Sequence, residues 1–354
     1  MKGWAMKRDA ILKRSSEIRR TILGEIEKNP KGITSLIVRK FKISRQAATR
    51  YLTQMVAEGQ LTAKGTTKDR SYRIGKTKSE LVKTYDLTQA LEESDIWVSD
   101  FKPLCEGVKP NVSGICAYGF TEMVNNALDH SDGKVLKITF QRTPKEVALV
   151  IEDDGVGIFG KIKEVFHLSD ERQAILELSK GKLTTDPAKH TGEGIFFTSR
   201  SFDQFSINSH ELTFSHQNIL ENDVLLHEKK EIPGTSVHMR IKTNSGRKLK
   251  GVFDKFADPD NNYTFDKTIV PVRLAQYEGE ALLSRSQAKR LMLRVENFKT
   301  VMLDFEGVKS VGPAFADEIF RVYKNQHPQV ALIPIHAAAE VHKMINRAKA
   351  TDIQ

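Results

Sequence analysis

The chain has 354 residues, of which 39% are hydrophobic and 28% charged, enough for two or three globular domains with cores of their own. It holds no run of 18 apolar residues, and its first twenty residues are charged without an apolar segment. We therefore expect neither a membrane-spanning helix nor a secretory signal. The two cysteines, Cys105 and Cys116, are expected to be buried thiols in a cytoplasmic protein.

The net charge of +10 is concentrated near the start of the chain. Residues 1–84 hold 21 Lys and Arg against 7 Asp and Glu, whereas the rest of the chain is slightly acidic. A basic block on a nearly neutral protein indicates a polyanionic partner for that block. A solvated basic surface would give the same composition, so charge alone leaves both interpretations open.

Residues 15–75 predict three helices followed by a hairpin. Apolar residues recur at three- and four-residue steps between Ile18 and Ile26, and a second short helix is expected over 34–41. Ser44 is a suitable N-cap for a third helix, which Gly59 ends, because its hydroxyl can accept a backbone N–H of the first turn. Residues 61–75 predict two strands around a polar, basic turn.

This order of elements resembles the winged helix-turn-helix family over residues 1–75. The resemblance implies that the third helix enters the major groove of duplex DNA while the hairpin, or wing, contacts phosphates. A winged helix can also dock on protein, and that alternative stays open. The residues expected at DNA are Arg45, Gln46, Thr49 and Arg50 on the helix and Lys64, Lys68 and Arg70 on the wing.

Residues 76–110 are expected to form a linker and a helical arm. The following segment, 117–133, predicts a helix on which Glu122, Asn126 and Asp129 share one face and apolar residues fill the rest. A carboxylate and a carboxamide facing a cleft suit Mg²⁺, which prefers a few oxygen ligands and phosphate oxygens. Many solvent-facing helices carry the same residue types, so this helix alone does not specify a metal site.

Three glycine-containing turns follow the helix. The strand VALVIEDDGVGIF ends at Asp153, and the glycines after it allow close approach of a planar ligand to the backbone. The turn in HTGEGIFF runs into an expected helix, whose first N–H groups can bind phosphate. The third turn, in IPGTSVHMRI, opens a strand in which Thr235 can form a hydrogen bond with a ligand.

In this order and spacing, ExxxN, DxGxG, GxG and GT resemble the GHKL ATPase family, which includes gyrase, the mismatch-repair protein MutL and sensor histidine kinases. The resemblance covers residues 111–242, or a longer segment that starts near 85, and implies a two-layer α/β Bergerat sandwich that binds ATP and Mg²⁺. It implies that residues 159–191 form a mobile lid over the nucleotide. The implied site residues are Asn126 for Mg²⁺, Asp153 for the adenine amino group, Gly155 and Gly157 along the adenine pocket, Gly192 and Gly194 at the phosphates, and Thr235 near the adenine.

Glu122 is the expected catalytic residue. A carboxylate near the γ-phosphate can orient or deprotonate an attacking water, and the ATP-hydrolysing branch of the family carries Glu at this position. EMVNNALDHS also resembles the anti-sigma serine kinases, which have Glu there too. Hydrolysis is favoured, and phosphate transfer to protein stays open.

Residues 243–262 are polar and are expected to be a linker with a short helix, and residues 263–354 alternate strand and helix as in a small α/β domain. The segment TVMLDFEGVKSVGPAFADEIF resembles the STAS-like domains of anti-sigma-factor antagonists. Gly312, Pro313 and Ala314 stand where those domains carry a phosphorylatable Ser, and Ser310 lies two or three positions too early. We therefore expect a packing or partner module that lacks the phosphate acceptor.

Together these segments predict a multidomain α+β protein: an α-rich winged helix, a Bergerat sandwich and a STAS-like α/β domain. The expected function is that of a cytoplasmic, Mg²⁺-dependent ATPase whose nucleotide state regulates binding of duplex DNA or of a protein partner. A homodimer is compatible with this organisation. Two alternatives remain: a transcription regulator that senses nucleotide without hydrolysing it, and a protein serine kinase of the anti-sigma type.

Overall fold

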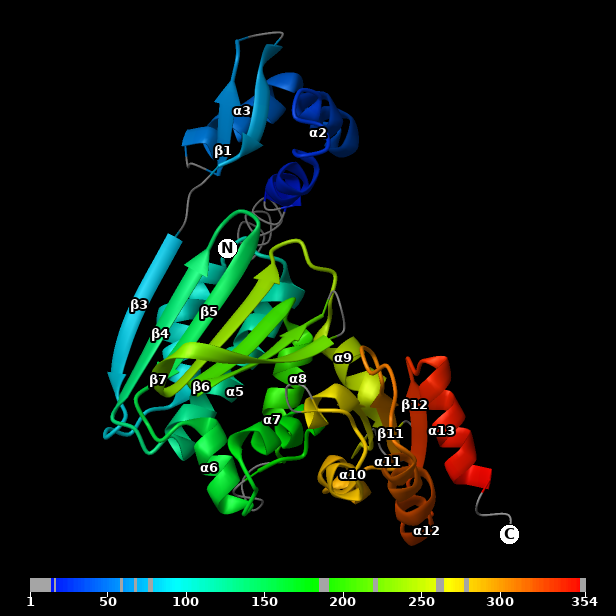
Figure 1. Cartoon of the computed structure of the whole chain (residues 1–354). Helices are drawn as coiled ribbons and strands as arrows, with labels where there is room; N and C mark the ends of the chain where they lie inside the picture. The colour runs from blue at the N-terminus through cyan, green and yellow to red at the C-terminus, as the bar shows by residue number, and fades with distance from the viewer. Residues whose placement is uncertain are drawn as a thin grey trace.

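The computed structural model describes residues 14–15, 17–57, 60–66, 69–75, 79–184, 191–218, 222–258, 264–276 and 280–350. Over these ranges the chain is a mixed α+β protein with three clusters of buried apolar side chains, arranged along the molecule as Figure 1 shows. None of the helices in these ranges combines the length and the apolar character that crossing a bilayer requires.

The N-terminal part consists of helices and one hairpin around a small core that includes Ile22, Ile37 and Leu52. Its last helix begins directly after Ser44, whose hydroxyl oxygen accepts the N–H of Ala47 at 3.1 Å, as expected of an N-cap. The elements are a helix over 17–25, α2 (Ile33–Phe41), α3 (Arg45–Ala57), and the antiparallel strands β1 (Leu61–Lys64) and β2 (Ser71–Ile74).

The central part is an antiparallel five-stranded sheet with helices packed on one face (Figure 1). Alternate residues of its inner strands are buried, as in Leu136, Ile138 and Phe140, because one face of the sheet meets the helices and the other does not. In spatial order the strands are β3 (Ser79–Asp86), β4 (Val135–Arg142), β5 (Glu146–Asp153), β7 (Asn222–Lys242) and β6 (Gln204–Gln217).

The segment expected to be a linker and arm, 76–110, belongs largely to this central part. Its strand β3 pairs along its whole length with β4, and Ile96, Trp97 and Phe101 lie in the central core. Residues 76–78 lie outside the described ranges. The helical elements on the sheet are α4 (Glu93–Ile96), η2 (Trp97–Phe101), η3 (Lys102–Cys105), α5 (Pro110–His130), α6 (Ile158–Val165), α7 (Glu171–Lys180) and α8 (Gly194–Ser201).

The C-terminal part has a parallel three-stranded sheet in the order β10 (Lys267–Pro271), β11 (Thr300–Asp304), β12 (Ala331–Ile335). Parallel neighbours need helical crossovers, which the alternation of strand and helix in the sequence predicts. These helices are α10 (Arg285–Met292), α11 (Pro313–Asp317), which continues through η7 (Glu318–Tyr323) and α12 (Lys324–Gln326), and α13 (Ala339–Ala350); two short 3₁₀ turns are η5 (Val272–Ala275) and η6 (Val295–Asn297).

The expected linker 243–262 instead begins a packed junction between the central and C-terminal parts. Its helix α9 (Leu249–Phe256) precedes the short pair β8 (Ala257–Asp258) and β9 (Thr264–Phe265). The Phe253 ring lies 5.6 Å from that of Tyr118 on α5 and 4.4 Å from that of Phe197 on α8. Phe196 and Phe197 belong to the same buried cluster as the C-terminal sheet, so the two parts share one core.

A desolvated ion pair reinforces this junction. Lys180 and Glu177 on α7 are each 1% exposed and lie 2.7 Å apart, and the Lys180 ammonium also donates to the carbonyl of Leu293. Burial raises the pKa of Glu177 and lowers that of Lys180. Because α7 is buried on most of its surface, this part of the expected lid 159–191 is a core helix; residues 185–190 lie outside the described ranges.

Candidate functional site

The candidate site lies around the C-terminal half of α5. Apolar residues of this helix, including Phe120, Met123 and Val124, are buried against the sheet, while Glu122 and Asn126 lie one turn apart on another face. A Cβ atom added to Gly194, the first residue of α8, would overlap the carboxylate of Glu122. The fold therefore brings the second glycine turn against the expected catalytic carboxylate.

Asn126 contributes a buried polar group without a partner. Its side-chain amide nitrogen is shielded from solvent and forms no hydrogen bond with the described residues. Leaving a buried amide unpaired costs about 1–3 kcal/mol, so folded proteins rarely do so without a reason. A phosphate oxygen beside this amide would accept from the nitrogen, and the amide oxygen would then be placed to bind Mg²⁺. The amide therefore fits the ligand set that the resemblance implies.

Asp153 ends β5 directly opposite Thr235 of β7. One of its oxygens, Oδ1, accepts the backbone N–H groups of Gly155 at 3.0 Å and of Thr235 at 3.2 Å. Burial raises the pKa of Asp153, and these two hydrogen bonds partly offset the rise because they favour the charged form. The result is a shielded carboxylate held in a fixed orientation at the end of a strand.

Backbone contacts hold the turn after Asp153 against α5 and β7. A Cβ atom added to Gly155 would overlap the carbonyl of Ser131, the residue that follows α5, so glycine is required there. Gly157 precedes α6, whose first N–H, that of Ile158, donates to the Thr235 hydroxyl at 3.1 Å. The Asp153 turn, the Thr235 strand and the end of α5 therefore form one bonded unit.

Gly192 and Gly194 frame the start of α8. The carbonyl of Gly192 accepts the N–H of Leu183 at 3.2 Å. This hydrogen bond joins the segment before residues 185–190 to the segment after them. Glu193, between the two glycines, has a pKa raised by burial. The structure thus brings Glu122, Asn126 and this turn together, and α5 connects them with the unit around Asp153.

Two further residues, Asp154 and Gly234, lie beside the Asp153 carboxylate. Asp154 is exposed and accepts the backbone N–H groups of Lys134 and Val135 at 2.7 and 2.8 Å, which lowers its pKa. Gly234 lies so close to the Asp153 carbonyl that a Cβ atom there would overlap it. Pro233, Gly234 and Thr235 lie within β7, so the turn expected there is part of a strand, and nothing local in the sequence distinguishes Asp154 from Asp153.

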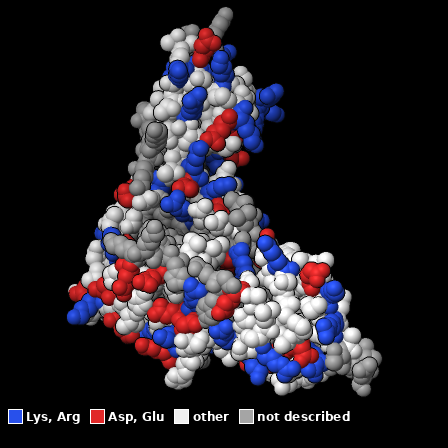
Figure 2. Space-filling view, viewed as in Figure 1, with Lys and Arg blue, Asp and Glu red and all other residues white. Residues whose placement is uncertain are grey.

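A second candidate surface is the outer face of α3. Its inner face buries Ala48, Leu52 and Met55, which leaves the polar face towards solvent. The expected DNA-contacting residues of the helix lie together on one open surface with Thr53 and Gln54. Figure 2 shows Lys and Arg side chains gathered over this end of the molecule. The residues that line it are Arg45, Gln46, Thr49 and Arg50.

The three wing residues differ in their surroundings. Lys64 is exposed at the end of β1, where it can reach a phosphate. Arg70 lies over the ring of Tyr72, 5.4 Å from its centroid, and its Nε is buried without a partner in the described residues. Arg70 thus packs against the hairpin, and only part of its side chain is exposed to solvent. Lys68 lies outside the described ranges.

Comparison with known proteins identifies the C-terminal part. Residues 287–342, from α10 into α13, match the family described as a STAS-like domain of unknown function (DUF4325). No curated protein matches the chain. Within the matched segment, Gly312 precedes α11, Pro313 and Ala314 begin it, and Ser310 is exposed just before. The chain therefore carries a C-terminal STAS-like domain.

Proposed function

We propose that residues 79–242 bind ATP with Mg²⁺ and hydrolyse the ATP, and that the nucleotide state controls how the flanking domains bind DNA or a protein partner. The observation that carries this proposal is the meeting of Glu122 with the Gly194 turn beside the unpartnered amide of Asn126. The four motifs that resemble GHKL ATPases supply these groups and the Asp153 turn in the order typical of that family.

The proposed binding mode assigns one role to each group. Asp153 accepts a hydrogen bond from the exocyclic amino group of adenine, and Thr235 helps to orient that carboxylate. The backbone at Gly155 and Gly157 lines the base. The N–H groups at the start of α8 face the phosphates, where the helix dipole favours negative charge. Asn126 holds Mg²⁺, which supplies charge neutralisation for the transferred phosphoryl group.

Glu122 carries the proposed chemistry. Its carboxylate takes a proton from a water molecule as the water oxygen bonds to the γ-phosphorus, and the bond from that phosphorus to the β,γ-bridging oxygen breaks. The products are ADP and inorganic phosphate, and Glu122 then returns its proton to solvent. Because Glu122 contacts the first residue of α8, the departure of the γ-phosphate changes the environment of that helix.

Helix α8 provides a physical route from the nucleotide to the STAS-like domain. Its first residue meets Glu122, whereas Phe196 and Phe197 in its middle pack on Phe265 at ring-centroid distances of 4.6 and 4.9 Å. A displacement of α8 must therefore repack the core that it shares with the C-terminal sheet. This geometry supports a regulatory use of the nucleotide more than simple turnover.

ATP labelled at the γ-phosphate tests the proposal on the full-length protein. Release of free labelled phosphate supports hydrolysis, whereas retention of all label on bound ATP would favour the non-hydrolysing sensor. Label on the protein itself would favour the serine kinase. Gly312, Pro313 and Ala314 occupy the expected acceptor positions of this chain, which argues against phosphorylation of its own STAS-like domain but not against a kinase that acts on another protein.

A further inference from the structure

A polar cavity of about 360 Å³ lies where the β6–β7 hairpin and α9 meet the C-terminal sheet. It is bordered by Pro271 and Asp304, the last residues of the parallel strands β10 and β11. In α/β sheets, ligands typically bind outside the carboxyl ends of parallel strands. Its volume lies near the lower end of the range for small-molecule sites, so it suits a compact metabolite.

A buried histidine borders this cavity and has one ring nitrogen without a partner. His216 is 5% exposed, and its Nδ1 lies 2.6 Å from Oδ1 of Asp223. Although burial opposes it, attraction to His216 and Arg200 lowers the pKa of Asp223, so the carboxylate is ionised and can only accept. Nδ1 therefore carries a proton, and the other nitrogen, Nε2, is buried without a hydrogen-bond partner in the described residues.

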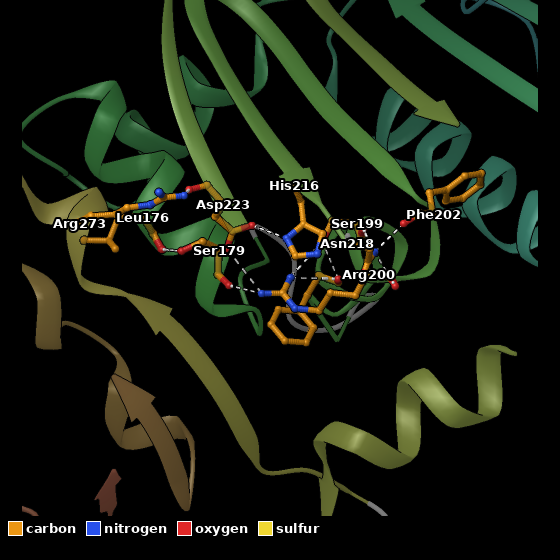
Figure 3. A network of polar contacts seen from close by, with 10 residues as sticks. Leu176, Ser179, Ser199, Arg200, Phe202, His216, Asn218, Asp223 and Arg273 are labelled. Carbon is orange, nitrogen blue, oxygen red and sulfur yellow. Dashed lines mark hydrogen bonds and ion pairs between the residues drawn. The ribbon is translucent and has the colours of Figure 1, made fainter. Parts of the chain in front are cut away.

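The same network holds the end of α8, as Figure 3 shows. Arg200 stacks on Phe196 with its guanidinium carbon 3.6 Å from the ring centroid, and it lies 3.7 Å from the Asp223 carboxylate. The Asn218 amide donates to the carbonyls of Ser199, Arg200 and Phe202, and Arg273 from the STAS-like side donates to the Asp223 carbonyl. The wall of the cavity is therefore built from fixed side chains of both parts of the protein.

More cationic than anionic side chains border the cavity. Four cationic residues stand against the two carboxylates of Asp223 and Asp304. Two of the four are ion-paired, Arg200 with Asp223 and Arg247 with Asp203. The Asp304 carboxylate already accepts the backbone N–H of Glu306 and lies 2.9 Å from Nδ1 of His336. The cationic residues are Arg200, Arg247, Lys248 and Lys255.

We propose that this cavity binds a small oxyanion, a metabolite carrying a phosphate or carboxylate group, which accepts a hydrogen bond from Nε2 of His216. A bound anion favours the doubly protonated ring, in which Nδ1 donates to Asp223 and Nε2 donates to the ligand. The exposed Lys248 and Lys255 supply further positive charge at the cavity. The residues that border this site are separate from those proposed to bind ATP.

Nitrogen-15 NMR of the histidine rings in the full-length protein tests the proposal with inorganic phosphate, glycerol 3-phosphate and citrate as probes. At millimolar concentrations at least one probe is expected to shift the Nε2 resonance of His216 and to leave that of His327, which stacks on Tyr323, unchanged. A response to the phosphates alone would identify a phosphoryl ligand, and a response to citrate alone a carboxylate ligand. Unchanged His216 resonances with all three would overturn the proposal.

Variants distinguish this site from the nucleotide site. Lys248→Gln with Lys255→Gln changes only exposed side chains and is expected to weaken probe binding at least tenfold, which corresponds to 1.4 kcal/mol. Asp153→Asn, which impairs the proposed ATP site, is expected to leave the His216 response intact. Equal affinity in the lysine variant would overturn the proposal, as would loss of the response in the Asp153 variant.

Discussion

Asp153 and Asp154 are neighbours in the sequence but have opposite environments, which makes them a matched pair. Asp153→Asn is expected to weaken ATP binding by at least about tenfold, because a buried charged acceptor is lost and such losses cost about 1–3 kcal/mol or more. Asp154→Asn is expected to retain ATP affinity, because that exposed carboxylate only holds the backbone of residues 134 and 135. Calorimetric titration measures both, and equal affinities in the two variants would refute the site assignment.

The raised pKa of Asp153 gives a pH dependence with a definite sign. Protonation removes the acceptor for the adenine amino group, and a raised pKa moves this step to higher pH than for an ordinary aspartate. ATP affinity is therefore expected to fall, as the solution is acidified, before exposed carboxylates titrate. Titrations with ATP at several pH values check this. A fall in affinity only at the pH where an ordinary exposed aspartate takes up its proton would contradict it.

Glu122→Gln separates binding from chemistry. The variant is nearly isosteric, so ATP binding is expected to persist, while hydrolysis falls by about a hundredfold or more because the general base is lost. Glu152→Gln is the control, since Glu152 is paired with Lys137 on the sheet and has no proposed role. Turnover measured by phosphate release should be normal in the control, and normal turnover in Glu122→Gln would remove this residue from the chemistry.

At the scale of elements, sequence patterns predicted the helix starts and strand ends that neighbouring residues determine. The N-cap at Ser44 and the strand-to-turn transition at Asp153 follow from nearby residues alone. The edge strand β3 lacks the buried alternation that would distinguish it from a linker. The lid over 159–191 follows only from the family resemblance, whereas in the structure α7 buries Glu177 and Lys180 as an ion pair. The role of α9 depends on aromatic contacts between distant segments, which leave no periodic signal.

The exposed face of α3 carries a prediction of its own. Arg45→Ala with Arg50→Ala in the full-length protein is expected to weaken binding to duplex DNA, because each neutralised phosphate releases condensed counterion. The slope of log affinity against log salt should decrease in magnitude by about 0.9 for each phosphate that the variant no longer neutralises. Lys343→Gln with Lys349→Gln on α13 removes the same charge elsewhere and is the control. Fluorescence anisotropy at several salt concentrations measures the slopes; equal slopes in the two variants would favour a protein-docking surface.

At the scale of the whole molecule, the shared core joins α7 and α8 to the STAS-like domain in one packed unit. Leu176 of α7 and Phe196 of α8 lie in the same buried cluster as Val270 and Leu303 of the C-terminal strands. Thr268 of β10 also donates to the Lys180 carbonyl at 2.6 Å. If the chain binds nucleotide as proposed, packed side chains connect that site with the STAS-like sheet.

The buried pair Glu177–Lys180 tests this unit. Removing one partner, as in Lys180→Met, leaves the other charge buried and is expected to cost about 3–5 kcal/mol of unfolding free energy. Replacing both, with Glu177→Leu and Lys180→Met, is expected to recover most of that stability, because two apolar side chains of similar volume carry no desolvation cost. Urea unfolding of both single variants, Glu177→Leu and Lys180→Met, and of the double variant gives the coupling free energy. If the ion pair joins the two parts, the Lys180→Met variant should also release the STAS-like domain to limited proteolysis while the double variant resists it. A single variant as stable as the double one would show that Glu177 is neutral or solvated in the folded protein, and that the packed aromatic side chains alone hold the junction.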